Sequence, residues 1–388
     1  MFTNREIGSR IQRVREEVGK SVSDLAQALG VDAGVVRQIE EGTLDPLPGD
    51  YVLIAARVLL TDFRYFISIE LDSIEEETRR VYRALSQPKP SDLFAIRRFM
   101  AMSLAEAELE NLLGIHPQSL PPYYPPANLR RAKHIDQAIN AAHAERVRLK
   151  LGNAPVSNIF DIARSQGCRL LRHVLEDSAV SGLTVMHPTA GISVLVNYDD
   201  DIYRQFFSAA HEYAHVLFDR ETIQKSGCVV SYSYSGEELI ELRANRFAAH
   251  FLLPPTALER YDRPRTVAEL TTTIRTVALD YRVNTATVVY RMHEAGWITE
   301  RTSRSFSKKK PVKIGRKEKR DPDLPEGLTE AQRVRRERAI QTGVSSRLLE
   351  LLRTALIDGQ ITFGRFAEIL DLTVDAADEF VRATGVAL

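Results

Sequence analysis

The chain has 388 residues, a length that suits several compact domains better than one core. Apolar residues make up 44% and charged residues 27% of the chain, as in ordinary globular proteins, so the composition excludes a disordered or fibrous chain. The 52 basic and 52 acidic residues cancel, so attraction to nucleic acid or to a membrane has to be local.

The compartment follows from the cysteines and the N-terminus. Cys168 and Cys228 are too few for a secreted disulfide framework, and residues 1–10 lack the apolar core of a signal peptide. We therefore expect a cytoplasmic protein. No run of about 18 apolar residues occurs, so we expect no membrane span.

Residues 1–70 are expected to form short helices, two of which meet at Gly30. Residues 25–31 read L-A-x-x-L-G-V and residues 39–42 read I-E-x-G. This pattern resembles the XRE-type helix-turn-helix of phage-like repressors. The resemblance implies that the second helix of the pair enters the major groove of DNA, with Arg37 and Gln38 as candidate contacts.

The charge of this module leaves a second interpretation open. Residues 1–60 hold seven basic and nine acidic residues, a net charge of −2, although phosphate neutralisation is the main source of DNA affinity. The module is therefore interpreted either as a DNA-binding unit or as a helix-turn-helix retained for dimerisation or for docking a protein substrate.

The next segment, residues 71–127, is predicted to be a helical connector with a proline-rich end. Residues 73–115 keep a helical, richly charged pattern, and five prolines follow between Pro117 and Pro126. Proline fixes φ and removes a hydrogen-bond donor, so we place a domain boundary here.

Residues 128–300 are predicted to form an α+β domain with a small sheet beside helices. Helices are expected at 128–151 and 157–166, two strands between 182 and 197, and helices again from 202 onward.

This domain contains the motif H-E-x-x-H, formed by His211, Glu212 and His215 inside an apolar helical segment. Four residues turn a helix by about 400°, so both histidines project from nearly one face and can share one metal ion. Imidazole nitrogens suit zinc, and Glu212 can deprotonate a water that attacks a peptide carbonyl. Chance spacing is the alternative that any motif carries.

A catalytic zinc site usually needs a third protein ligand. Residues 237–250 read as a second amphipathic helix, in which Glu241 is our first choice and Glu238, one turn earlier, the second. Asn245 is a candidate for a hydrogen bond to a ligand, or for a packing role. His250 lies half a turn from Glu241 on this helix, so we expect a structural role for it.

After the H-E-x-x-H motif, the chain reads E-x-x-A-N-x-F-A from Glu241 and L-L-P at 252–254. Together these motifs resemble the ImmA/IrrE family of metallopeptidases, over roughly residues 128–300. The resemblance implies a zinc-dependent endopeptidase that cleaves a partner repressor and so releases genes for stress response or mobile-element transfer. It makes His211, His215 and Glu241 the zinc ligands, and Glu212 the general base.

Three further features of the domain stay open at this stage. Tyr232 and Tyr234 are candidate oxyanion donors, although tyrosines without a catalytic duty are commoner. The strand at 192–196 is a candidate edge for an extended substrate. Cys228 is either a regulatory thiolate near the metal or, more often for a lone cysteine, a small buried apolar residue.

The C-terminal part is predicted to be a basic linker at 301–328 and a small helical unit at 329–388. Residues 301–320 hold ten basic residues and one acidic residue. Residues 359–372 resemble the short helix-turn-helix of antitoxin-like proteins, and a helix pair that binds protein is the alternative.

Two functions compete. The first is a zinc endopeptidase that regulates transcription by cleaving a specific protein such as a repressor. The second is a DNA-binding regulator or antitoxin whose peptidase-like domain senses a metal or a ligand without proteolysis. Helix-turn-helix proteins commonly act as dimers, so a homodimer is a candidate assembly under both hypotheses.

Overall fold

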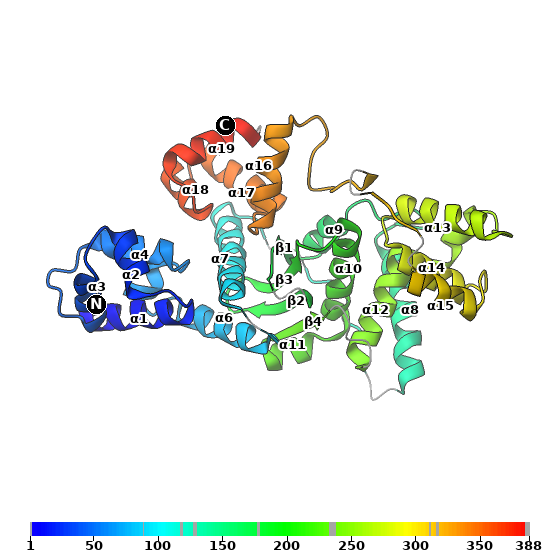
Figure 1. Ribbon diagram of the computed structural model, residues 1–388, viewed down its shortest axis with the longest axis horizontal. Helices are drawn as coiled ribbons and strands as arrows, with labels where there is room; N and C mark the ends of the chain where they lie inside the picture. Colours follow the sequence, from blue (N-terminus) through cyan, green and yellow to red (C-terminus); the bar gives the residue numbers. More distant parts are fainter. Residues whose placement is uncertain are drawn as a thin grey trace.

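The computed structural model describes residues 2–87, 89–116, 119–126, 130–176, 179–232, 238–309, 312–315 and 318–384. It confirms the predicted α+β class, because helices dominate the chain and surround one small sheet. Figure 1 shows an N-terminal helical bundle at one end, a C-terminal helical unit above α7, and the helices α13 to α15 at the opposite end. Within the described ranges, no helix is both long enough and apolar enough to cross a membrane.

The N-terminal bundle is held by helix caps and one buried ion pair. The side chains of Thr3 and Ser21 cap α1 and α2, and Arg15 Nε lies 2.5 Å from Glu40 Oε1 between α1 and α3. Helices α1 and α3 approach so closely that a Cβ at Gly8 would lie 1.9 Å from a backbone oxygen of α3. The bundle consists of α1 (Asn4–Glu17), α2 (Val22–Leu29), α3 (Ala33–Glu41), α4 (Gly49–Val58) and α5 (Phe63–Ile67).

Two further helices precede the sheet domain and four close the chain. The first two are α6 (Asp72–Ala84) and α7 (Pro90–Leu112), and the last four are α16 (Glu330–Gln341), α17 (Ser346–Ile357), α18 (Phe363–Ile369) and α19 (Val374–Thr384). The sheet domain between them contains α8 (Arg131–Arg148), α9 (Ile159–Ser165), β1 (Arg169–His173), β2 (Val180–His187), β3 (Gly191–Asn197), α10 (Ile202–Phe218), α11 (Arg220–Ser226), β4 (Cys228–Tyr232), α12 (Leu239–Leu252), the 3-10 helix η1 (Pro255–Arg260), α13 (Val267–Tyr281), α14 (Thr285–Glu294) and α15 (Glu300–Lys309).

The sheet has the strand order β1-β3-β2-β4. β1 runs parallel to β3, and β2 runs antiparallel to both β3 and β4, with Leu183 opposite Leu195 on one side and Val230 on the other. The two predicted strands are β2 and β3. The expectation that residues 192–196 form a sheet edge is wrong, because β3 lies between β1 and β2.

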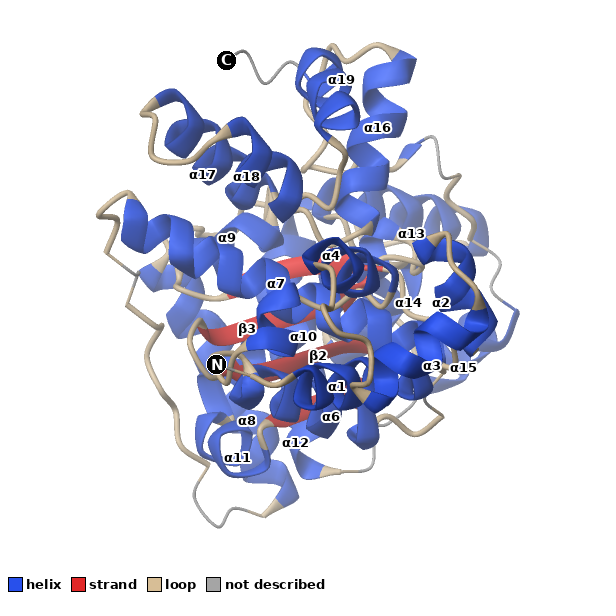
Figure 2. Cartoon of the chain, turned by 90° about the vertical axis from the view of Figure 1, so that its left-hand side faces the viewer, coloured by secondary structure: helices blue, strands red, loops and turns tan. Residues whose placement is uncertain are grey.

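Helices cover both faces of the sheet, and Figure 2 shows the strands crossing the middle of the molecule among them. Strand side chains alternate between the faces. Leu170 and Val194 belong to a core with α10 and α12, whereas Leu171, Leu183 and Leu195 belong to a second core with α6 and α7. The segment expected to be a connector therefore supplies the layer behind the sheet.

The C-terminal unit rests on this layer. Arg98 on α7 donates from Nε to the carbonyl of Thr342 at 2.7 Å, and the Ser345 hydroxyl donates to the buried carboxylate of Glu106.

The expected linker begins with α15. Further along it, Asp323 is buried and lies 2.9 Å from Arg172 and 3.1 Å from Arg164. The linker is thus clamped to β1 and α9.

This clamp gives a stability prediction. Asp323→Asn removes one of two carboxylates that pair with the fully buried Arg172, Asp321 being the other, and it also removes a partner of Arg164. We therefore expect the free energy of unfolding to fall by roughly 2 kcal/mol. Urea denaturation followed by circular dichroism measures the change. Glu326→Gln is the control, because that carboxylate pairs with Arg320 while 86% exposed, and its loss should leave the denaturation midpoint unchanged. Equal midpoints for the two variants would contradict a buried clamp.

Candidate metal centre

The candidate metal centre is built on α10, a helix buried around nearly its whole circumference. The Asp201 carboxylate caps its first turn by accepting from the backbone N–H of Tyr203 at 3.1 Å. From there the helix runs between the sheet and α12, which explains why apolar residues occur on all its faces. His211 is 5% exposed, and His215 and Glu212 are fully buried.

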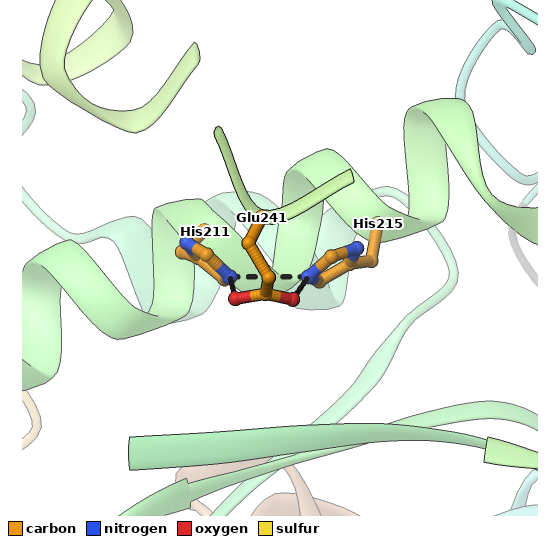
Figure 3. A group of neighbouring side chains, drawn as sticks. All are labelled: His211, His215 and Glu241. Atoms are coloured by element: carbon orange, nitrogen blue, oxygen red, sulfur yellow. Dashed lines mark hydrogen bonds and ion pairs between the residues drawn. The ribbon is translucent and has the colours of Figure 1, made fainter. Parts of the chain in front are cut away.

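His211 and His215 meet a carboxylate from α12. Their Nε2 atoms lie 3.0 Å apart, and the two oxygens of Glu241 lie 3.3 Å from His211 Nε2 and 3.4 Å from His215 Nε2 (Figure 3). The ligand atoms of the three residues all lie within 4.8 Å of one another. Two imidazoles and one carboxylate are a donor set typical of catalytic zinc.

The contacts of the two Nδ1 atoms favour a metal ion between the two Nε2 atoms. His211 Nδ1 lies 2.9 Å from Asn245 Oδ1, and His215 Nδ1 lies 2.8 Å from Asp219 Oδ2. An oxygen acceptor at Nδ1 keeps the ring proton there, which leaves the Nε2 lone pair of each ring directed at the other ring and at Glu241. Two lone pairs 3.0 Å apart need a cation, either an extra proton or a metal ion.

The pKa values of His215 and Glu241 also indicate that a positive charge stabilises the cluster. Burial works to lower the pKa of His215, but hydrogen bonds to Asp219 and Glu241 outweigh it and raise this pKa to about 10. Burial works to raise the pKa of Glu241, but hydrogen bonds from both histidines hold it well below its usual range. A divalent ion would replace the extra proton in this cluster.

A network behind the cluster fixes Asp219. Arg243 of α12 donates from Nη2 to Asp219 Oδ1, and both side chains are almost completely buried. Arg243 Nη1 also lies 3.2 Å from His134 Nδ1 on α8. The network joins α8, α10 and α12, and therefore holds the His215 ring in one orientation.

Glu212 points from α10 to the sheet. Its Oε2 accepts a hydrogen bond from the Thr184 hydroxyl at 2.7 Å. A Cβ at Gly182 would lie only 2.8 Å from Glu212 Oε1, so the absence of a side chain there makes room for the carboxylate. Burial raises the pKa of Glu212, against the effects of His215 and His211. The carboxyl group is therefore disposed to hold a proton.

The other predicted site residues occupy different places. Asn245 contacts His211, as described above. Glu238 is exposed at the N-cap of α12, away from the cluster. His250 lies 3.0 Å from Glu294 and 2.9 Å from Arg291 Nη1, which agrees with its expected structural role.

Tyr232, one of the two tyrosine candidates, does not reach the centre. Tyr232 packs on the α6 face of the sheet, and its hydroxyl donates to the carbonyl of Ala84 at 3.1 Å. Its neighbour Ser231 faces the centre instead, with Oγ 3.4 Å from His215 Nε2. Tyr234 lies outside the described residues. Cys228 is buried on the α6 face, and burial raises the pKa of its thiol to about 11, so it behaves as an apolar core residue.

Four residues that contact His215 or Glu212 were not predicted from the sequence. Asp219 lies four residues after His215, on the same helical face, and this spacing would have revealed it. Gly182, Thr184 and Ser231 reach the site from strands, and no local pattern in the sequence distinguishes them from their neighbours.

The hydrogen bond to His211 gives a second prediction. Asn245→Ala leaves all three ligands in place but frees the His211 ring, so zinc affinity should fall by about 10- to 100-fold. Competition with a chromophoric chelator measures it. Glu238→Ala, at the exposed N-cap of the same helix, where the side chain makes no cap hydrogen bond, serves as the control and should bind zinc as the unaltered chain does. An unchanged affinity in Asn245→Ala would show that Asn245 does not orient a ligand.

Two stretches of the chain match known protein families. Residues 163–293, which include the three clustered residues and Glu212, match the peptidase M78 family, described as the IrrE N-terminal-like domain. Residues 10–56 match a helix-turn-helix domain. Comparison with curated proteins gives no match. The predicted resemblance is confirmed: the chain carries an IrrE N-terminal-like peptidase M78 domain behind an N-terminal helix-turn-helix domain, as in an ImmA/IrrE protein with such a module.

Proposed function

We propose that the chain is a zinc-dependent endopeptidase of the cytoplasm that regulates transcription by cleaving a specific protein, such as a repressor. The observation that carries this proposal is the convergence of His211, His215 and Glu241 beside a buried Glu212. The family match supports peptidase chemistry in the domain that holds these residues.

Each residue has a distinct task in this proposal. His211, His215 and Glu241 would hold zinc, which when bound acts as a Lewis acid on a peptide carbonyl and on water. Glu212 accepts the proton of the attacking water, and its raised pKa lets it keep that proton until the leaving amine takes it. Thr184 holds the carboxylate in place throughout.

The sheet offers a place for the substrate at β4. β4 is the last strand at one edge of the sheet. Its residue Ser231 faces His215. An extended substrate segment that adds to this strand would run past the ligand cluster, with main-chain hydrogen bonds holding it.

Substrate cleavage is tested without knowing the substrate in advance. Strains of the source organism with the unaltered gene, Glu212→Gln or His215→Ala are compared by mass spectrometry of protein N-termini. We expect new N-termini in one or a few proteins of the unaltered strain and none of them in either variant. Glu212→Gln keeps the proposed ligands, so it should still bind zinc.

The opposite result is equally informative. If all three strains have the same protein N-termini under DNA damage and oxidative stress while the purified chain binds one zinc ion, the chain cleaves no protein under these conditions. The alternative, a regulator that senses metal or ligand without cutting, would then be favoured.

For the N-terminal module we propose DNA binding through α3, with the chain acting as a dimer. α3 is the second helix of the pair α2 and α3, and its residues Arg37 and Gln38 are exposed. The net charge of −2 in residues 1–60 predicts weak binding, and few phosphate contacts predict only a shallow fall in affinity as salt rises.

A pair of arginine variants tests this interface. After selection of a preferred site from random DNA, Arg37→Ala should weaken binding to that site by about 5- to 100-fold, because it removes a base or phosphate contact. Arg13→Ala makes the same charge change on α1, where the side chain is 61% exposed, and should have a smaller effect. Equal losses in both variants would indicate general electrostatics, and the absence of any selected site would favour a protein-docking role.

A further inference from the structure

The positive charge of the chain is concentrated in one segment, which consists of α15 and the residues that follow it. Residues 301–320 hold ten basic residues and one acidic residue, a net charge of +9. The remainder of the chain holds 42 basic and 51 acidic residues, a net charge of −9. Attraction to a polyanion, which has to be local in a chain of zero net charge, is therefore strongest at this segment.

Three exposed basic side chains form a stripe along α15, which we call the basic stripe. Arg301, Arg304 and Lys308 are spaced i, i+3 and i+7, so they share one face of the helix. Phe306 lies about half a turn from this face and is buried in the core that contains α10 and α12. The packing of Phe306 therefore turns the basic stripe towards solvent.

The chain beyond α15 continues this exposed positive charge. Val312 and Ile314 pack against the same core as Phe306, whereas Lys313 between them is exposed. Arg275 of α13 donates to the carbonyl of Lys313 at 2.9 Å. These contacts hold the Lys313 side chain on the surface beside the peptidase-like domain, so the basic stripe and Lys313 form one fixed basic face.

The two acidic residues next to this basic face leave its charge largely uncancelled. Glu300 pairs with Arg304 at 2.6 Å, but the two side chains are 65% and 73% exposed, and such a pair is weak. Glu318 pairs with Arg275, whose charge balances it. Within the described residues, no ion pair engages the other three basic side chains of the face, Arg301, Lys308 and Lys313.

We propose that this basic face binds the phosphate backbone of duplex DNA without reading its sequence. The basic stripe is about 10 Å long, which corresponds to roughly three phosphates of one strand. Guanidinium and ammonium groups that neutralise phosphates release the counterions of the DNA, and this release supplies the affinity. DNA is favoured over other polyanions because the same chain carries a helix-turn-helix domain.

The basic face is separate from the DNA surface proposed for α3. In Figure 1, α15 lies at the end of the molecule opposite the N-terminal bundle, so one surface does not complete the other. Changes at the two surfaces should therefore affect DNA affinity additively.

The test measures fluorescence anisotropy of a labelled duplex of random sequence with the full chain, between about 50 and 200 mM KCl. The triple variant Arg301→Gln, Arg304→Gln and Lys308→Gln should bind roughly tenfold more weakly at the lowest salt. Each lost phosphate contact removes about 0.9 from the slope of log affinity against log salt concentration, so the slope should become shallower by about 2 to 3.

A second triple variant is the matched control. Arg333→Gln, Arg335→Gln and Arg338→Gln make the same charge change at three exposed positions on α16 of the C-terminal unit, and should leave the slope nearly as it is in the unaltered chain. Adding Arg37→Ala to the variant of the basic stripe separates the two DNA proposals. The loss from the basic stripe should persist in this background whether or not α3 binds DNA.

Three results would overturn the proposal, with all variants folded by circular dichroism. The first is that the unaltered chain does not bind the duplex at the lowest salt. The second is an equal slope in the unaltered chain and the variant of the basic stripe, or an equal loss in the two triple variants, which would indicate net charge alone. The third is binding to phosphatidylglycerol vesicles that the duplex does not displace, which would assign the basic face to a membrane surface.

Discussion

The sheet is buried on both faces, and this constraint assigns each strand side chain to one of two cores. Gly182 and Thr184 of β2 face α10 because Leu183 between them faces α7. On β4, Ser231 faces the ligand cluster because Tyr232 faces α6. A slip of one residue in either strand would exchange these faces and remove the support of Glu212.

The helical half of the centre could be predicted from the sequence because helix geometry is local. The spacing of His211 and His215 fixed their common face, and the structure brings Glu241 and Asn245 of the second helix to them. The role of Asp219 follows from the same periodicity, four residues after His215. Helix periodicity shows which residues of each helix share a face, whereas the meeting of α10 with α12 is a contact between separate segments that the structure supplies. Whether these residues bind zinc stays a prediction.

The remaining strands, the buried ion pairs and the role of residues 71–127 depend on contacts between segments far apart in the sequence. β1 and β4 have five residues each and are largely buried on both faces, so they lack the polar alternation that identifies a strand exposed on one face. The acidic partners of Arg172 lie about 150 residues away, within a segment whose composition is mainly basic. Residues 71–127 looked like a connector for the same reason, since only the sheet reveals what α6 and α7 cover.

The central claim is that two imidazoles and one carboxylate hold a zinc ion beside Glu212. Zinc K-edge X-ray absorption of the full chain with one equivalent of zinc tests it directly. We expect nitrogen and oxygen ligands at about 2.0 to 2.2 Å, with the imidazole signal reduced in His215→Ala. A sulfur ligand at about 2.3 Å, or a chain that retains no zinc after dialysis, would contradict it.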